Sequence, residues 1–327
     1  MKMNHPKKIL IIRNDHIGDL ILSSAIFREI KKKIPDSKIF LIASKLNRPL
    51  IEKNKNIDEI IELEKAEYNL KTFWNFLKMS KKIKKINFDA GIDLRGSVMN
   101  SFFLLYLPGI KKRIGRIDLH PIVSSLLTDP VKINPDTHAL KDNLKIINEG
   151  LEINAKNEKP EIITDKEDQK NFDFFIKKNK LKKYVCICPY AGLKCKQWPL
   201  ENWKNLIQWF KKYNYDIILL GVKKDIDGLK RLSGENKRCR IALDFNLRLM
   251  YLLFKKSSLI ITQDGGPMHI AWVSGAKLIE LHNLFLYGMN KVVPLGKNSK
   301  IIYAKNVDMN SIDIEEVKKA TEKILKS

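Results

Sequence analysis

The chain has 327 residues, 44% of them hydrophobic and 30% charged, which is enough apolar material for a core and excludes a wholly disordered protein. The formal net charge of +24 predicts attraction to polyanions such as nucleic acid, an anionic membrane or a phosphorylated substrate. A Lys-rich solvated surface is the alternative explanation, and the spread of basic residues along the whole chain fits it better than a nucleic-acid-binding stripe.

Neither a membrane span nor a secretory signal is expected. The longest aliphatic and aromatic run, 102–107, is far shorter than the ~20 residues that a spanning helix needs. Lys7, Lys8 and Arg13 interrupt the apolar residues near Met1. The four cysteines form no C-x-x-C pair, so zinc and redox chemistry are not expected of them. These features predict a cytoplasmic protein.

The first half of the chain alternates short apolar runs with amphipathic segments. Residues 8–13 predict a buried strand, 19–34 a helix and 38–43 a second strand, which together form a β-α-β unit with a right-handed crossover. The same pattern predicts further strands at 57–63 and 88–94, a short strand or loop at 113–115, and helices at 70–86, 100–107 and 141–150, the last ended by Gly150.

A polar, Lys-rich stretch at 151–183 separates this half from a second one with the same pattern. We therefore expect two Rossmann-like domains with parallel sheets, at 1–165 and 180–310, followed by a terminal helix at 311–327. The second half predicts strands at 184–189, 215–221, 259–262 and 277–281, and helices at 200–212, 226–232, 267–274 and 312–325, with one more at 166–178 before them.

Three segments at predicted strand ends could carry chemistry. Asp19 follows Gly18 where the first long helix begins, so it is either an ordinary first-turn residue or a general base. The loop 189–199 combines small residues with lysines and suits a phosphate, although it lacks the spacing of a P-loop. The segment 264–269 places two glycines at a helix start, which is typical of an anion site. Together they suggest a transferase that uses a phosphate-activated donor.

Four segments follow in this order: KILIIRNDHIGDLILSSAIFREIKKKIPDSKIFLIAS (8–44), DLRGSVMNSFF followed by KKRIG (93–115), PYAGLKCKQWPLENW (189–203) and LIITQDGGPMHIAWVSGAKLIEL (259–281). Together they resemble glycosyltransferase family 9, the bacterial heptosyltransferases. The resemblance implies a GT-B fold, with two Rossmann-like domains facing across a cleft. It also implies an inverting transfer without a metal or other cofactor, from a nucleotide-diphosphate sugar such as ADP-heptose to a lipid-linked lipopolysaccharide or lipooligosaccharide core.

The resemblance also implies roles for individual residues. Asp19 would be the base that deprotonates the acceptor hydroxyl. Lys196 would contact the donor phosphates, and Asp264 would hold heptose hydroxyls. The other donor residues would be Ala191, Gly192, Gly265, Gly266 and His269.

Further candidates come from the residues themselves. Arg95, Arg113 and Arg116 could bind an acidic acceptor sugar or its phosphates, and Gly18 would let the acceptor approach the backbone closely. Asp225 could approach the nucleoside ribose, whereas the D-x-D pattern that it starts is interpreted as accidental.

Two departures from the family pattern leave the sugar and the base open. Ala191 stands where the family often has Ser or Thr, and residues 282–296 replace a loop that is usually rich in Thr and Pro.

The helix at 70–86 interleaves aromatic residues with lysines, which is typical either of a helix at an anionic membrane surface or of a sheet-covering helix with a solvated face. The first interpretation predicts a peripheral protein on the cytoplasmic face of the inner membrane.

Three other functions compete with this prediction. The same fold could use a hexose or N-acetylhexosamine donor. The chain could be a pseudo-enzyme that only binds sugar nucleotides, although all three chemical groups, Asp19, Lys196 and Asp264, are present. It could also be a basic nucleic-acid-binding protein, but the sequence lacks a recognition helix or an RNP-type aromatic set, so no nucleic-acid partner is expected.

Overall fold

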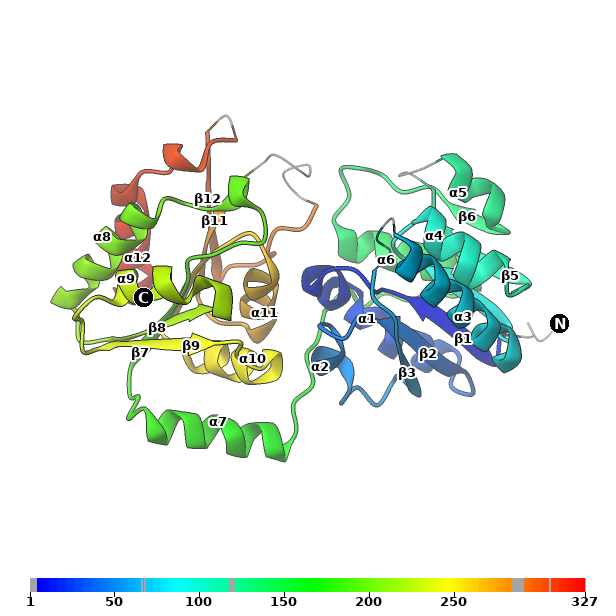
Figure 1. Ribbon diagram of the computed structural model, residues 1–327, viewed down its shortest axis with the longest axis horizontal. Helices are drawn as coiled ribbons and strands as arrows, with labels where there is room; N and C mark the ends of the chain where they lie inside the picture. Colours follow the sequence, from blue (N-terminus) through cyan, green and yellow to red (C-terminus); the bar gives the residue numbers. More distant parts are fainter. Residues whose placement is uncertain are drawn as a thin grey trace. The chain divides into compact units, whose positions relative to one another are not determined.

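The computed structural model describes residues 5–65, 67, 69–117, 121–283, 291–305 and 307–326. The chain forms two compact units, one made of Met1–Ile163 and Asn290–Val292 and the other of Thr164–Met289 and Val293–Ser327. Each unit has a sheet with helices on its faces (Figure 1).

The first unit contains a six-stranded parallel sheet in the order β3-β2-β1-β4-β5-β6. Its strands are β1 (Lys8–Ile12), β2 (Lys38–Ala43), β3 (Glu59–Glu62), β4 (Ala90–Asp93), β5 (Lys112–Arg116) and β6 (Asp129–Val131). Its helices are α1 (Ile17–Lys33), α2 (Arg48–Ile51), α3 (Leu70–Ile86), α4 (Val98–Asn100), the π-helix η1 (Ser101–Tyr106), α5 (Pro121–Leu126) and α6 (Ala139–Leu151).

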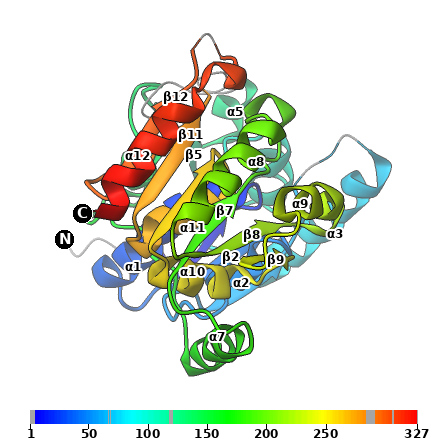
Figure 2. The same ribbon diagram turned by 90° about the vertical axis from the view of Figure 1, so that its left-hand side faces the viewer.

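The second unit repeats this architecture with the sheet order β12-β11-β10-β7-β8-β9 (Figure 2). Its strands are β7 (Tyr184–Cys188), β8 (Asp216–Gly221), β9 (Cys239–Leu243), β10 (Leu259–Gln263), β11 (Leu278–His282) and β12 (Ser299–Tyr303). Its α-helices are α7 (Lys166–Lys178), α8 (Leu200–Trp209), α9 (Ile226–Ser233), α10 (Leu247–Lys256), α11 (Gly266–Ser274) and α12 (Ile314–Lys326). Short 3-10 turns are η2 (Lys194–Lys196), η3 (Phe210–Lys212), η4 (Lys223–Asp225) and η5 (Met309–Ser311).

The central strands are apolar on both faces because helices cover both sides of each sheet. Ile9, Leu10, Ile11 and Ile12 of β1 are all fully buried, as expected for a parallel strand in a doubly wound fold. The prediction of two Rossmann-like domains with parallel sheets is therefore confirmed.

One predicted helix end is wrong. Gly150 does not end α6, which continues to Leu151, and Glu152 adopts the left-handed conformation at its end with φ of 55°. A Cβ atom on Gly150 would lie 2.2 Å from Cγ2 of Ile114 in β5. Glycine is needed here because α6 packs closely on the sheet.

The order of both sheets reverses at one position. In the first unit β1 lies between β2 and β4, and in the second β7 lies between β8 and β10. The loops after neighbouring strands then leave in opposite directions, and a crevice at the carboxyl ends of the strands is where such folds bind ligands. The described residues contain no helix that is both long and apolar enough to span a membrane.

Candidate functional site

Asp19 lies in the first turn of α1, directly after the β1 strand and therefore at the position where the first sheet reverses. The residue is half-buried, and burial raises the pKa of its carboxyl group. The negative charge of Asp15 raises this pKa further, while Arg13, His16 and Arg116 lower it. A raised pKa brings a carboxylate closer to the value that suits a general base near neutral pH.

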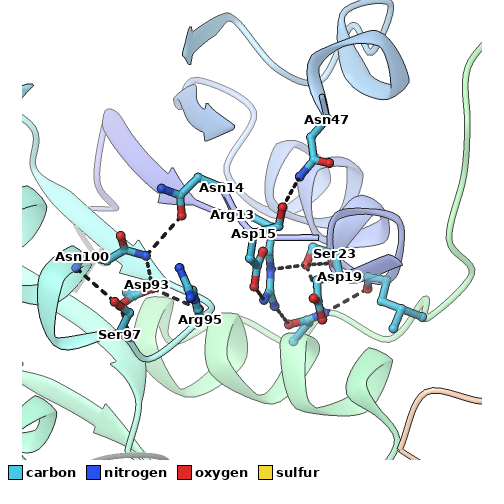
Figure 3. A network of polar contacts seen from close by, with 12 residues as sticks. Arg13, Asn14, Asp15, Asp19, Ser23, Asn47, Asp93, Arg95, Ser97 and Asn100 are labelled. Atoms are coloured by element: carbon cyan, nitrogen blue, oxygen red, sulfur yellow. Dashed lines mark hydrogen bonds and ion pairs between the residues drawn. The ribbon is translucent and has the colours of Figure 1, made fainter. Parts of the chain in front are cut away.

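A buried arginine holds this segment in place. Arg13 Nε donates to Ser23 Oγ at 3.0 Å, Nη1 to Asp15 Oδ2 at 3.1 Å and Nη2 to Asn143 Oδ1 at 3.1 Å. Ser23 Oγ in turn donates to the Asp19 carbonyl at 2.8 Å. The arginine thus links the end of β1 to α1 and α6 and keeps the Asp15 carboxylate near Asp19 (Figure 3).

A second carboxylate ends β4, the strand beside β1. Asp93 is fully buried and accepts hydrogen bonds from the backbone N–H groups of Arg95 and Ser97, each at 3.0 Å, and from Ser101 Oγ at 2.9 Å. Burial raises the pKa of the Asp93 carboxyl, although these hydrogen bonds oppose the shift. Asp93 therefore fixes the turn that follows β4.

Asparagine side chains join the two strand ends (Figure 3). Asn100 Nδ2 donates to Asn14 Oδ1 at 3.4 Å and to Asp93 Oδ1 at 3.5 Å. Asn47 Nδ2 donates to the Asp15 carbonyl at 3.2 Å. Asp93 and these asparagines were not predicted from the sequence; the available signal was a polar residue directly after an apolar strand.

The predicted acceptor residues divide into two groups. Gly18 immediately precedes Asp19 in α1, and Arg116 is near enough to lower the pKa of Asp19. Gly96 takes φ of 70° beside Arg116, and a Cβ atom there would lie 2.6 Å from Arg116 Cγ. Arg95 follows Asp93 in the same turn (Figure 3). The structure thus places Gly18, Arg95 and Arg116 at the carboxyl edge of the sheet, where Asp19 also lies.

Arg113 lies elsewhere. It is near the start of β5, at the amino edge of the sheet, and its Nε donates to the Leu126 carbonyl at 2.7 Å. Its Nη1 donates to the Ile110 carbonyl at 2.8 Å, and the guanidinium lies 5.5 Å from the centroid of the Tyr106 ring. These contacts give Arg113 a structural role in this edge, so we do not place it with the other acceptor candidates.

Lys196 and Asp264 form an ion pair in the second unit. Lys196 ends the η2 turn after β7, and Asp264 follows β10, the strand next to β7. The side chains are only 12% and 6% exposed. The pair therefore occupies the position where this sheet reverses, and its lysine can contact a phosphate while its carboxylate accepts from hydroxyl groups.

Amide side chains fix the loop that carries Lys196. Gln263 Nε2 donates to the Pro189 carbonyl at 2.8 Å, and Gln263 Oε1 accepts from the backbone N–H of Trp198. Asn283 Nδ2 donates to the Cys195 carbonyl at 2.6 Å. The loop is consequently tied at both ends and in its middle to β10 and to the end of β11. These amides were not predicted from the sequence either.

Ala191 and Gly192 lie in this loop, near the carboxyl end of β7. Gln197 Nε2 donates to the Ala191 carbonyl at 2.9 Å. Gly192 is exposed, and a Cβ atom on it would meet no other atom within 4 Å. Packing within the protein therefore does not require glycine at this position, and the open space is available to a ligand.

Gly265, Gly266 and His269 form the start of α11. Gly265 is the N-cap, Gly266 is the first helical residue, and His269 lies one turn further on and is buried. The backbone N–H groups in the first turn of a helix attract anions. This helix begins directly after Asp264, so it adds anion-binding groups beside the Lys196–Asp264 pair.

Asp225 lies one strand further away, after β8. Its Oδ2 accepts from the backbone N–H of Val222 at 3.1 Å, and its charge, after burial, helps to raise the pKa of Tyr190. It does not contact the Lys196–Asp264 pair through any hydrogen bond or ion pair described. Among the described residues, no three His, Cys, Asp or Glu side chains are arranged to hold a metal ion.

The model for glycosyltransferase family 9 (heptosyltransferase) matches residues 76–321. The chain belongs to glycosyltransferase family 9. It is therefore a glycosyltransferase, as the resemblance of its motifs predicted.

Relatives and solved structures agree with this family. The lipopolysaccharide core heptosyltransferase OpsX of Haemophilus influenzae is 24% identical over 85% of this chain and 79% of its own length. Lipopolysaccharide heptosyltransferase 1 of Campylobacter coli is 24% identical over 98% of this chain and 97% of its own. The family 9 glycosyltransferase of Veillonella parvula superposes with a TM-score of 0.84 at 18% identity, covering 98% and 97% of the two chains. E. coli heptosyltransferase WaaC with ADP-2-deoxy-2-fluoro heptose gives 0.76 at 17% identity, covering 97% and 99%. The GT-B fold class is confirmed.

This family 9 chain has a second buried pair beside the first. His282 Nδ1 lies 2.7 Å from Glu280 Oε1 at the carboxyl end of β11, and Glu280 is fully buried. Burial raises the pKa of Glu280. Burial alone would lower the pKa of His282, but the hydrogen bond and charge of Glu280 outweigh it and raise that pKa. His282 is the first residue of the segment 282–296, which departs from the family pattern. Residues 284–290 of that segment lie outside the described residues.

Proposed function

We propose that this enzyme transfers heptose from ADP-heptose to a lipopolysaccharide or lipooligosaccharide core acceptor, with inversion at the anomeric carbon and without a metal. We further propose that it works at the cytoplasmic face of the inner membrane, in peripheral contact with that membrane. One observation carries the proposal: Asp19 stands where the first sheet reverses, and the Lys196–Asp264 pair stands where the second does. The names of the relatives support the donor and acceptor classes.

Asp19 acts as the general base in this mechanism. Its carboxylate accepts the proton of an acceptor hydroxyl, and the oxygen attacks the anomeric carbon of the heptose. The bond from that carbon to the phosphate oxygen breaks, and ADP leaves. Because the nucleophile approaches opposite the leaving group, the anomeric configuration inverts. The raised pKa of Asp19 makes its carboxylate a better proton acceptor.

Charge develops on the departing diphosphate, and the second unit supplies groups that stabilise it. The Lys196 ammonium and the N–H groups at the start of α11 both favour negative charge. Asp264 accepts hydrogen bonds from sugar hydroxyls and orients Lys196 through their ion pair. Two preorganised sources of positive potential perform the task that a divalent cation performs in other glycosyl transfers, so no metal is needed.

A donor screen tests this proposal. ADP-heptose, ADP-glucose and GDP-, UDP- and CDP-sugars are added separately, and thermal unfolding and nucleotide release are followed with core-oligosaccharide acceptors. We expect ADP-heptose to give the largest stabilisation and ADP release to require the acceptor. ADP-glucose tests whether the sugar or only the base is recognised. Selective turnover of another nucleotide sugar would show that the donor is not ADP-heptose and would leave the mechanism unchanged. The absence of any response would contradict the proposal.

A further inference from the structure

Helix α3 and helix α4 lie on one face of the first sheet (Figure 1). Aromatic rings connect α3 to the η1 segment, which continues α4. Trp74 contacts Phe73 with ring centroids 5.7 Å apart, and Phe73 contacts Phe103 at 5.6 Å. Phe103 contacts Phe102 at 5.0 Å, which stacks on Tyr106 at 6.0 Å. The rings form one continuous row from α3 to the end of η1.

The outer members of this row are exposed, together with neighbouring apolar side chains. We call this surface the α3–η1 face. Its members and their exposed fractions are Leu70 (79%), Trp74 (58%), Tyr106 (49%), Leu107 (43%) and Phe73 (41%). Single exposed apolar residues are common on soluble proteins, but a connected group of this kind marks an interaction surface.

The charge on the rest of α3 is of one sign. The helix has no Asp or Glu and carries six exposed lysines, Lys71, Lys78, Lys81, Lys82, Lys84 and Lys85. The spacing of residues 70, 74, 78, 81 and 85 places Leu70 and Trp74 in line with three of these lysines on one helical stripe. The stripe is therefore apolar in its first turns and basic along the remainder.

We propose that the α3–η1 face and the lysines of α3 bind the surface of an anionic lipid bilayer. Aromatic and aliphatic side chains enter the boundary between headgroups and acyl chains, and lysines beside them attract anionic headgroups. Only the purpose of this surface rests on the proposed function: membrane binding would bring the enzyme to a lipid-linked acceptor. The N-termini of α1 and α3 both follow carboxyl ends of strands in one parallel sheet, so Leu70 and Trp74 lie at the same sheet edge as Asp19.

A bilayer fits the surface better than a protein does. The cores of protein interfaces are poor in lysine, whereas here lysines adjoin the apolar residues directly. A second copy docked through the same face would oppose six lysines with six lysines, because a two-fold contact pairs each patch with itself. An anionic bilayer provides both the apolar phase and the opposite charge.

Vesicle flotation tests this proposal without donor or acceptor. Wild-type enzyme is mixed with vesicles of phosphatidylcholine alone or of phosphatidylcholine with phosphatidylglycerol. We expect binding to the mixed vesicles only, and a steep loss of binding with added salt. The triple variant Lys78→Gln/Lys81→Gln/Lys85→Gln should bind on the order of 100-fold more weakly, since each lysine near an anionic surface contributes a factor of about five. Leu70→Ser/Trp74→Ser should also lose binding.

Matched variants in the second unit control for net charge and hydrophobicity. Lys319→Gln/Lys323→Gln/Lys326→Gln removes three exposed lysines from α12, and Phe174→Ser removes an exposed ring from α7; both should bind as wild type. In the wild type, lipids brominated in their acyl chains should quench a fluorescence component that is missing from Trp74→Phe. All variants should turn over a delipidated core acceptor at the wild-type rate, because none of these residues is assigned to the transfer site.

Three results would overturn the proposal. The first is recovery of the wild type only with the unbound protein in the flotation. The second is a loss of binding in the control variants as strong as in the α3 variants. The third is a Leu70→Ser/Trp74→Ser variant that loses a dimer in solution and keeps its vesicle binding. Vesicle binding without sugar transfer would contradict the proposed function instead and leave the membrane surface standing. Transfer to a delipidated acceptor without vesicle binding would contradict the membrane surface and the membrane contact proposed with it, and would leave heptosyl transfer standing.

Discussion

Arg13 Nη1 lies 3.1 Å from Asp15 Oδ2, and both side chains are almost completely buried beside the proposed base Asp19. The arginine and the aspartate act on Asp19 in opposite directions: the Asp15 charge raises the pKa of its carboxyl, and the Arg13 charge lowers it. The segment between β1 and α1 thus sets the proton affinity of Asp19 through charges that are themselves fixed by hydrogen bonds.

Two substitutions should move the acid limb of the rate profile in opposite directions. Asp15→Asn removes a charge that raises the pKa of Asp19, so the acid limb of kcat/KM should shift to lower pH. Arg116→Gln removes a charge that lowers it, so the limb should shift to higher pH. Measuring kcat/KM across the acidic range checks both. Equal shifts of the same sign, or no shift in either variant, would show that Asp19 does not control this limb.

Lys196→Ala should weaken donor binding. A hydrogen bond between charged groups contributes about 1.5–3 kcal/mol, so the Kd for ADP-heptose should rise about 10- to 100-fold. Lys194→Ala is the matched control, because Lys194 is an exposed lysine on the same turn and has no described contact with Asp264; its Kd should stay within about twofold. Calorimetric titration measures both constants. Equal effects of the two substitutions would mean that Lys196 contributes only general positive charge and makes no specific contact with the donor.

The Glu280–His282 pair should make stability depend on pH. The pKa values of both groups are raised in the folded protein, so folding binds protons, and this stabilisation is lost as pH rises above about 6.5 and through the raised pKa of His282. In Glu280→Gln the carboxylate is gone and burial lowers the pKa of His282 instead. The variant should therefore lose less free energy of unfolding than the wild type as pH rises.

Urea unfolding at several pH values between about 6 and 8.5 measures this difference. The free energy of unfolding of Glu280→Gln minus that of the wild type should increase with pH across this range. A difference that is independent of pH would mean that His282 does not titrate with Glu280 in the folded protein.

The elements that the sequence predicted well are those whose own residues decide their structure. Strand β2 and helix α3 have the predicted bounds, because a buried apolar run and a capped amphipathic segment are local patterns. The edge strands β9 and β12 were missed because their side chains are mostly half-exposed and their apolar pattern is weak. Gly150 was misplaced because its role depends on a contact with Ile114 from another element.

The same distinction applies to the site. Asp19, Lys196 and Asp264 could be selected because each follows a predicted strand. The Gln263 contacts and the Asn100–Asn14 contact could not, because they depend on which strands are neighbours. Asn100 contacts Asn14 across 86 residues of sequence, and Gln263 reaches Trp198 across 65. Only the sheet order brings these residues together.

Transfer should continue in the presence of EDTA, because in the proposed mechanism Lys196 and the start of α11 supply the positive potential for the leaving diphosphate. The rate should stay within about twofold of the untreated enzyme and should not rise when Mg²⁺ or Mn²⁺ is added back. Loss of activity in EDTA that a divalent cation restores would refute the metal-independent mechanism.

The most direct test of the central claim is to measure turnover and donor affinity together in Asp19→Asn. The substitution keeps the size of the side chain and removes its ability to accept a proton. We predict that kcat for heptosyl transfer from ADP-heptose falls by about 10²- to 10⁴-fold while the Kd for ADP-heptose changes by less than about threefold. Near wild-type turnover, or a loss of donor affinity that accounts for the loss of activity, would contradict the assignment of Asp19 as the base.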